Sequence, residues 1–236
     1  MYAHFASFYD EWQDPLWYDR RISFLMKQAN LSPQDAVYEG GCGAGHMTRA
    51  LASAGLSVTA TDASVPMLRI AAKRLQDTQT RLFREDLRAL PVRTGFRAFL
   101  FCLDVIQYLA PDELLRLFRV VWQSLPPGGV LVFDHLPEKL LRLRAADPPV
   151  RYASDGKKML WKTRISGTQV RYELHLWENG EYLKEIQDLR VYKKREIRKL
   201  LLQSGDWQVH GFSDYTFRPM RAGSERYAWF AKKLET

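Results

Sequence analysis

Cysteine is scarce in this sequence: Cys42 and Cys102 are the only two among 236 residues. They stand in unlike surroundings, and neither belongs to the paired spacing of a zinc site or to a disulfide framework. The sequence therefore argues against a disulfide-stapled protein and predicts two free thiols. We expect no bound metal ion.

Long apolar runs are also lacking. A helix that crosses a membrane needs about 20 consecutive apolar residues, and no segment approaches this length. The beginning, MYAHF, lacks the basic region and apolar core of a secretion signal. We expect a cytoplasmic protein without membrane contact, and the length predicts one domain with a small insert.

Acidic residues are outnumbered, since 35 Lys and Arg stand against 27 Asp and Glu, for a formal net charge of +8. Such an excess can indicate a polyanionic partner, because Lys and Arg that contact phosphates release counterions. The basic residues are dispersed, however, and the densest run, at 193–199, is typical of the solvated face of a helix. Nucleic acid is therefore an open but less favoured partner, and we expect a monomer or dimer that acts on a small molecule.

The first 30 residues carry aromatic side chains in a helical pattern. Phe5, Phe8, Tyr9 and Trp12 stand at positions i, i+3, i+4 and i+7, which lie on one face of a helix. Residues 1–30 are therefore expected to form capping helices packed on the body. We expect the part up to residue 17 to act as a mobile lid over a ligand.

From residue 36 the sequence alternates between short apolar strands and amphipathic helices. Strands are predicted at 36–39, 57–61, 81–84, 98–103 and 130–134. Ser64 is expected to cap one of the intervening helices. Repeated strand–helix units demand a parallel sheet with right-handed crossovers. With closing strands at 207–212 and 226–231, the fold class predicted is α/β, a Rossmann-like, doubly wound, mostly parallel seven-stranded sheet.

The segment between the fifth strand and the closing helix has a different pattern. Strands are predicted at 159–165, 169–177 and 182–191, separated by Ser166-Gly167 and by Glu178-Asn179-Gly180, a strong hairpin signal. We therefore expect an antiparallel β insert after the fifth strand. The domain organisation predicted is a Rossmann-like body at 31–135 and 193–236, with 136–192 forming the acceptor-side lobe.

A glycine loop follows the first predicted strand, with the sequence EGGCGAG at 39–45. Glycines at such a strand-to-helix turn let the backbone approach a ligand closely. The dinucleotide fingerprint G-x-G-x-x-G requires a third glycine where this chain has His46, which weakens the interpretation as an NAD site. Glu39 would repel a pyrophosphate but could accept hydrogen bonds from an ammonium group. The loop therefore favours a ligand with an amino-acid end.

Two further acidic residues follow the next two strands. Asp62 lies about 20 residues beyond the loop, where an acid can accept hydrogen bonds from both ribose hydroxyls. Asp86 and Leu87 offer an acceptor for an exocyclic amine and an apolar neighbour for an adenine ring. For Asp86 the alternative is an ordinary helix or turn cap.

Together, the glycine loop, Asp62 and Asp86 resemble the class I S-adenosylmethionine-dependent methyltransferase superfamily, and the resemblance runs along nearly the whole chain. The chain looks like small stand-alone bacterial members that begin with a Tyr-Asp pair in a capping helix, here Tyr9-Asp10, and carry an antiparallel insert. It departs mildly from that pattern, with Glu39 where Asp is commoner and Ala44 where Thr or Ser is frequent.

The resemblance implies a methyltransferase whose cofactor is S-adenosylmethionine. It implies that Glu39, Gly41 and Gly43 hold the methionine end, that Asp62 holds the ribose, and that Asp86 and Leu87 hold the adenine. Tyr9 is expected to touch the methionine carboxylate. The remaining residues expected at the cofactor are Gly40, Cys42, Gly45, Ala63, Met67, Cys102 and Leu103.

The sequence does not specify the methyl acceptor. An Asn-Pro-Pro-Tyr motif and a Pro-Cys nucleophile are both missing. We expect in-line methyl transfer to a small-molecule amine or hydroxyl. The alternatives left open are an RNA or protein methyltransferase that uses the basic surface, and a non-catalytic module that binds S-adenosylmethionine.

Candidate catalytic residues are those expected near the open end of the sheet, because ligands of open α/β sheets bind at the carboxyl ends of the strands. They are His135, Asp104 and Tyr108. Trp161 and Tyr172 in the insert are predicted to line the acceptor pocket, although aromatic residues on a strand face are more often core.

Overall fold

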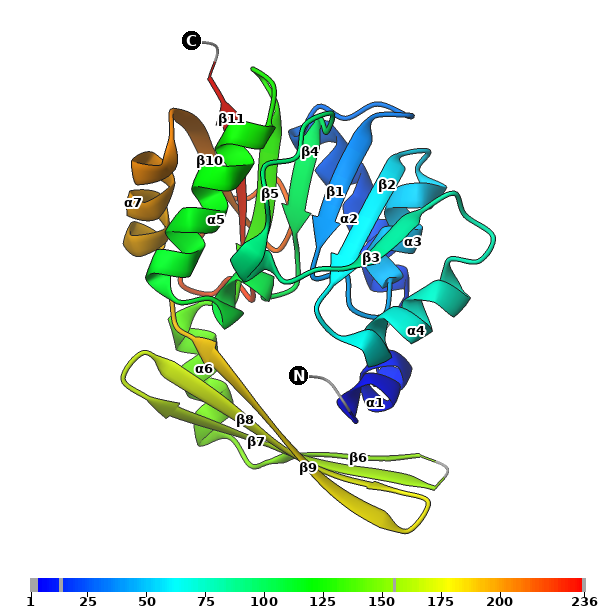
Figure 1. The fold of residues 1–236 in the computed structure, drawn as a ribbon. Coiled ribbons are helices and arrows are strands. Elements are labelled where there is room, and N and C mark those ends of the chain that lie inside the picture. Colours follow the sequence, from blue (N-terminus) through cyan, green and yellow to red (C-terminus); the bar gives the residue numbers. More distant parts are fainter. Residues whose placement is uncertain (1–3, 13–14, 155, 235–236) are drawn as a thin grey trace.

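The computed structural model describes residues 4–12, 15–154 and 156–234. Figure 1 shows a large sheet with helices on both faces and, beneath it, a smaller sheet of long strands. In these three ranges, no helix combines the length and the apolar character that crossing a membrane requires.

The large sheet has the strand order β10-β11-β5-β4-β1-β2-β3. Strands β1 to β5 are mutually parallel, and β11 runs antiparallel to both β5 and β10. The Rossmann-like, mostly parallel seven-stranded sheet predicted from the sequence is confirmed. Its strands are β1 (Ala36–Gly40), β2 (Ser57–Asp62), β3 (Arg81–Arg84), β4 (Ala98–Phe101), β5 (Val130–His135), β10 (Trp207–Ser213) and β11 (Tyr227–Lys233).

Strand β4 is shorter than the sequence predicted. It ends at Phe101, whereas the apolar run continues to residue 103. Leu103 and Asp104 have φ angles of 64° and 68°. Left-handed backbone cannot continue a β ladder, so the chain turns here into the short helix η2 (Val105–Tyr108).

The helices bury one apolar face each against the sheet. On one side, α2 (Pro15–Gln28) and α3 (His46–Ser53) share a core with β1 and β2, and α4 (Val65–Arg74) lies beside α3. On the other side, α5 (Pro111–Ser124) and α7 (Lys194–Ser204) share a second core with β4 and β5. The predicted cap of α4 is confirmed, because Ser64 Oγ accepts a hydrogen bond from Met67 N at 3.4 Å.

The second sheet has the order β6-β7-β8-β9 and is antiparallel throughout. The predicted antiparallel insert is confirmed, but the sequence indicated three strands and missed β6 and the connecting helix α6 (Glu138–Ala146). That this insert forms the acceptor-side lobe stays a prediction. Its strands are β6 (Val150–Ser154), β7 (Lys157–Ser166), β8 (Gln169–Glu178) and β9 (Glu181–Arg190).

Helix α1 (Phe5–Trp12) lies between the two sheets (Figure 1). Phe5 and Phe8 are fully buried in a cluster with Met159, Leu174 and Leu176 of the insert. Glu185 of β9 accepts hydrogen bonds from the backbone N–H groups of His4 and Phe5 at 3.1 and 3.2 Å. A carboxylate at the first turn is favourable because the unpaired N–H groups there carry partial positive charge.

Candidate active site

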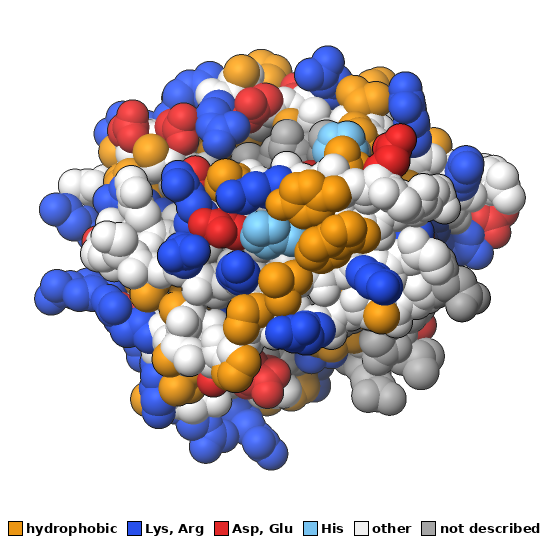
Figure 2. Space-filling view, turned by 90° about the horizontal axis from the view of Figure 1, so that it is seen from below, with side chains coloured by type: hydrophobic (Ala, Val, Ile, Leu, Met, Phe, Trp, Pro, Cys, Tyr) orange, Lys and Arg blue, Asp and Glu red, His pale blue; other side chains and the backbone are white. Residues whose placement is uncertain are grey.

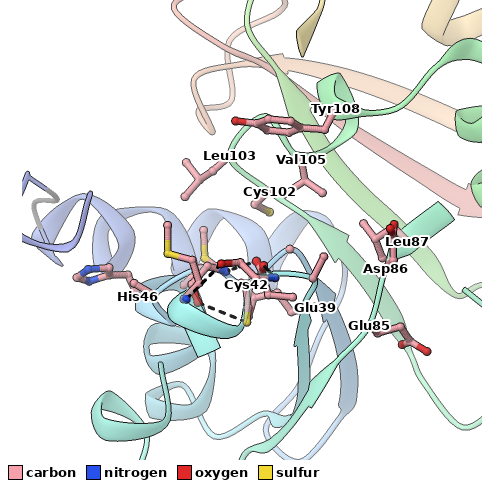
Figure 3. A pocket seen from close by; sticks show the side chains of 18 of the residues that line it. Glu39, Cys42, His46, Glu85, Asp86, Leu87, Cys102, Leu103, Val105 and Tyr108 are labelled. Atoms are coloured by element: carbon pink, nitrogen blue, oxygen red, sulfur yellow. Dashed lines mark hydrogen bonds between the residues drawn. The ribbon is translucent and has the colours of Figure 1, made fainter. Parts of the chain in front are cut away.

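A cavity of about 970 Å³, counting its open mouth, lies at the carboxyl ends of β1, β2 and β4 (Figure 3). Its walls come from α1, the glycine loop, the ends of the first strands and η2. The lining residues expected from the sequence are Tyr9, Glu39, Gly41, Cys42, Gly43, Asp62, Ala63, Met67, Asp86, Leu87, Cys102, Leu103 and Tyr108. Those that the sequence interpretation missed are Tyr18, Ala44, His46, Met47, Ser64, Glu85, Arg88, Val105 and Leu109.

The glycine loop exposes its backbone to this cavity at Gly43. Gly43 has a φ of 54°, and no heavy atom lies within 4 Å of the position where a Cβ would stand. A side chain here would strain the backbone and fill the space that a ligand needs. The loop therefore permits the close approach that was expected of it.

Gly40 and Gly45 belong to the same loop but do not line the cavity. A Cβ on Gly40 would stand 2.7 Å from Leu87 Cδ2, and one on Gly45 would stand 3.1 Å from Ala71 Cβ. Gly40 allows β1 to pack under Leu87, and Gly45 allows α3 to pack on α4. Both were expected at the cofactor, and the contacts they make in the structure are packing contacts.

Asp62 ends β2 and braces the glycine loop from below. Its Oδ2 accepts a hydrogen bond from Gly43 N at 2.8 Å, and its Oδ1 accepts one from Ser64 N at 2.7 Å. Burial raises the pKa of Asp62, while these two N–H donors oppose the rise. Each carboxylate oxygen can accept a second hydrogen bond, so Asp62 keeps acceptor capacity for a ligand in the cavity.

Glu39 ends β1 and is almost completely buried, at 3% exposure. Its Oε2 accepts a hydrogen bond from Thr48 Oγ1 at 2.6 Å. Burial raises the pKa of Glu39 to about 8, the nearby Asp62 carboxylate adds to the rise, and the Thr48 hydroxyl opposes it. A buried carboxyl with this pKa gains most from a cationic partner, because a positive charge nearby favours its ionised form.

The segment after β3 supplies another wall. Asp86 Oδ1 accepts a hydrogen bond from Arg88 N at 2.9 Å and caps the short helix η1 (Leu87–Ala89), so the capping role weighed for Asp86 is present. Its side chain also faces the cavity beside Leu87 (Figure 3). Glu85 was missed, and it is held by Tyr38 and Arg93 at 2.6 Å each.

The turn after β4 is fixed by a buried acid from β5. Leu103 N and Asp104 N donate to the two carboxylate oxygens of Asp134 at 2.8 and 2.9 Å. Arg226 pairs with Asp134 at 2.5 Å and also with Asp104. Although burial opposes its charge, these carboxylates raise the pKa of Arg226 well above its usual value. The turn thereby holds Leu103 and Tyr108 across the cavity from the glycine loop (Figure 3).

Of the three residues expected to be catalytic, only Tyr108 lines the cavity. Asp104 lies outside the lining and is paired with Arg226. His135 has no exposed surface and stacks on Trp229, and its Nε2 has no hydrogen-bond partner among the described residues. Burial lowers the pKa of His135 to about 4, so the ring is neutral at physiological pH.

Helix α1 closes the cavity on the remaining side. Asp10 contacts His46 Nε2 at 3.0 Å and Arg74 at 2.6 Å, which ties α1 to α3 and α4. Tyr9 and Tyr18 face the cavity, and burial raises the pKa of Tyr9 to about 12. The Tyr18 and His46 rings stack with centroids 5.1 Å apart. No sequence pattern paired Tyr18 with His46, because the contact joins two separate helices.

Both thiols in the wall are shielded. Burial raises the pKa of Cys42 and of Cys102 well above the usual range, and both cysteines are free. They contribute apolar surface and no nucleophile. Across the part of the chain that the structure describes, no cluster of three or more His, Cys, Asp or Glu side chains could hold a metal ion.

Known proteins resemble this chain in sequence and in fold. The family model for a "Methyltransferase domain" matches residues 37–129, which contain the glycine loop, Asp62 and Asp86. The "Putative methyltransferase YqeM" of Bacillus subtilis (strain 168) is 27% identical over 249 residues that span 100% of this chain and 98% of the relative. The chain is therefore similar to methyltransferases, in the matched domain and along the whole length of this relative.

Solved structures share the fold of this chain over nearly its whole length. One is an S-adenosylmethionine-dependent methyltransferase from Clostridium acetobutylicum ATCC 824, with a TM-score of 0.84, 23% identity and 99% of each chain covered. Another is CalS10 from Micromonospora echinaspora, an amino pentose methyltransferase solved with S-adenosylmethionine bound. It has a TM-score of 0.73 and 18% identity over 97% of this chain and 95% of its own.

Proposed function

We propose that this methyltransferase binds S-adenosylmethionine in the cavity with its amino-acid end at the glycine loop. The open backbone at Gly43 and the buried carboxyl of Glu39 suit an ammonium group. Asp62 supplies acceptors for ribose hydroxyls, and Asp86 with Leu87 suits an adenine ring. The cofactor, when bound, supplies a methyl group activated by a sulfonium.

We infer that the acceptor is a small molecule with an amine or a hydroxyl group, and that an amine is favoured. The observation that carries this choice is the set of tyrosine hydroxyls at the cavity, from Tyr9, Tyr18 and Tyr108. With a pKa of about 12, Tyr9 keeps its proton at neutral pH and orients an acceptor by hydrogen bonds. A neutral amine needs only this orientation, whereas a hydroxyl gains about 10²–10⁴ in rate from a general base.

The first experiment is calorimetry with S-adenosylmethionine, followed by a panel of acceptors with labelled cofactor. Micromolar binding is expected, about −8 kcal/mol. Because CalS10 acts on an amino pentose, amino sugars head the panel, beside matched sugars that carry a hydroxyl in place of the amine. Label transfer to the amino sugars supports the proposal. Absence of cofactor binding, or transfer to protein or tRNA alone, contradicts it.

Tyr108→Phe tests the acceptor wall. Losing one hydrogen bond to a bound acceptor is expected to lower kcat/KM by about twofold to tenfold, with the cofactor dissociation constant unchanged. Tyr182→Phe is the matched control, because Tyr182 is 51% exposed on the far side of the insert. Equal rates for Tyr108→Phe and wild type would remove Tyr108 from the acceptor site.

A further inference from the structure

The insert sheet has an inner and an outer face, because successive side chains of a strand point to opposite sides. The inner face carries Met159, Leu174 and Leu176, which are buried against α1. The outer face is turned away from α1 and from the cavity. Figure 2 views the molecule from that side and shows hydrophobic side chains beside a histidine, with Lys and Arg around them.

An aromatic cluster occupies one end of the outer face. Trp177 and Tyr182 are directly paired across β8 and β9, with ring centroids 5.3 Å apart. His175 stacks beside both rings, and its Nδ1 is 2.8 Å from the Tyr182 hydroxyl. Trp177 is 37% exposed and Tyr182 is 51% exposed. The two rings hold each other in place and are partly open to solvent. They therefore form an exposed apolar surface on which another molecule can pack.

Cations without partners border this cluster. By strand register, Lys158 stands opposite Trp177, and Lys184 stands opposite His175. Arg151 of β6 faces the same side one strand further along. None of these three forms an ion pair with a residue that the structure describes. The acidic side chains of this face are already neutralised, as Glu173 pairs with Arg164 and Asp188 pairs with Arg171.

We propose that the outer face of the β6–β9 sheet binds single-stranded RNA. Bases stack on the rings of Trp177 and Tyr182, and phosphates are held by Lys158, Lys184 and Arg151. A polyanion satisfies the charge of this face, and planar bases stack on aromatic rings such as these. We commit to RNA because unpaired bases are the form in which RNA is usually recognised. This goes beyond the proposed function, since the face lies on the opposite side of the insert from the cavity.

The test is binding of a fluorescent single-stranded RNA of about 10 nucleotides to the full-length protein. Trp177→Ala and Tyr182→Ala are each expected to weaken binding at least fivefold, the change that corresponds to about 1 kcal/mol of base stacking. Lys158→Glu and Lys184→Glu are expected to weaken binding and to flatten its dependence on log salt by about 0.7 for each phosphate that is no longer neutralised. The affinity for S-adenosylmethionine stays unchanged in all four variants, which shows that they fold.

Two matched controls separate this face from general effects. Lys199→Glu changes the net charge equally on the exposed side of α7, and Phe217→Ala removes a ring that is 59% exposed elsewhere. Both are expected to bind RNA as wild type does. The proposal is wrong if RNA does not bind at low salt, if the ring variants bind RNA normally, or if polyglutamate competes as well as RNA. It is also wrong if Trp177→Ala converts a dimer into a monomer and leaves the affinity for RNA unchanged.

Discussion

His135 lies at the end of the strand where it was predicted, but its side chain points away from the cavity. It ends β5, at the sheet edge where ligands of such folds bind, but alternate side chains of a strand point to opposite faces. Asp134 points toward the turn after β4, and His135 therefore points into the apolar core against Trp229. The sequence could not distinguish the two directions, because β5 is buried on both faces.

The buried neutral His135 predicts a pH dependence of folding. Its pKa is about 4 in the folded protein and about 6.5 when unfolded. Between these values the unfolded chain binds a proton that the folded protein does not, so stability is lost as pH falls from 6.5 to 4, by on the order of 3 kcal/mol from this residue. Denaturant titrations across this range are expected to show a shallower pH slope for His135→Phe than for wild type.

The same variant tests whether His135 takes part in catalysis. Phenylalanine keeps a planar ring but is larger than histidine, and enlarging a side chain in a packed core typically costs about 1–3 kcal/mol. At pH 7.5 we expect His135→Phe to fold and to retain methyl transfer. A folded but inactive variant would mean that His135 does take part in catalysis. The protein would then have to rearrange so that the His135 side chain reaches the cavity.

Asp62 serves both the protein and the proposed ligand. Asp62→Ala is expected to weaken S-adenosylmethionine binding by about 1.5–3 kcal/mol, the usual effect of losing hydrogen bonds to a charged group. The same substitution removes the hydrogen bond that Gly43 N donates to Asp62 Oδ2. Asp62→Asn keeps one acceptor oxygen and is expected to be intermediate. Calorimetry measures both variants, and wild-type affinity for the alanine variant would exclude Asp62 from the site.

At the scale of elements, the helices and strands that could be predicted are those that bury apolar side chains at regular intervals. Strands β1, β2, β4 and β5 and helices α3 to α5 bury apolar residues in regular patterns, and their sequences show it. Strand β6 is an edge strand with nearly every residue exposed, and α6 buries only Leu141. Neither presents a periodic apolar pattern, so both were missed. Tyr18 and His46 were missed because their place in the site depends on how two helices meet.

Helix α1 is the element on which the predicted lid depends. Residues 1–3, 13 and 14 of that segment fall outside the described residues. Asp10 joins α1 to the body by polar contacts with His46 and Arg74, beside the apolar contacts of Ala6. Asp10→Ala is expected to weaken cofactor binding by about tenfold or more, because a hydrogen bond to a charged group contributes about 1.5–3 kcal/mol, and to speed hydrogen exchange in α1 alone.

The matched control for this prediction is Asp77→Ala. Asp77 also pairs with an arginine, Arg49, but on the exposed surface of the body. It is expected to leave both cofactor affinity and exchange in α1 unchanged. If Asp10→Ala binds the cofactor as wild type does, α1 is a fixed part of the structure and the lid prediction is wrong.

At the scale of the whole molecule, the glycine-loop side of the cavity could be predicted and the opposite wall could not. The glycine loop, Asp62 and Asp86 each follow a strand of one parallel sheet, and parallel strands bring their carboxyl ends together without further information. The opposite wall depends on contacts between α1, η2 and the insert, which are distant in sequence. Trp161 and Tyr172 illustrate this: they pack together at 4.9 Å on the inner face of the insert, and neither lines the cavity.

Helix α1 touches both halves of the protein: Glu185 and Phe5 hold it to the insert, and Asp10 and Tyr9 hold it to the cofactor cavity. An element shared in this way links two binding equilibria. If the cofactor reduces the mobility of α1, it also reduces the mobility of the insert. A ligand that binds on the insert side then binds more tightly by some factor. Thermodynamic reciprocity requires that this ligand tighten cofactor binding by the same factor, so the order in which the two substrates arrive would change the pathway but not the affinity of the ternary complex.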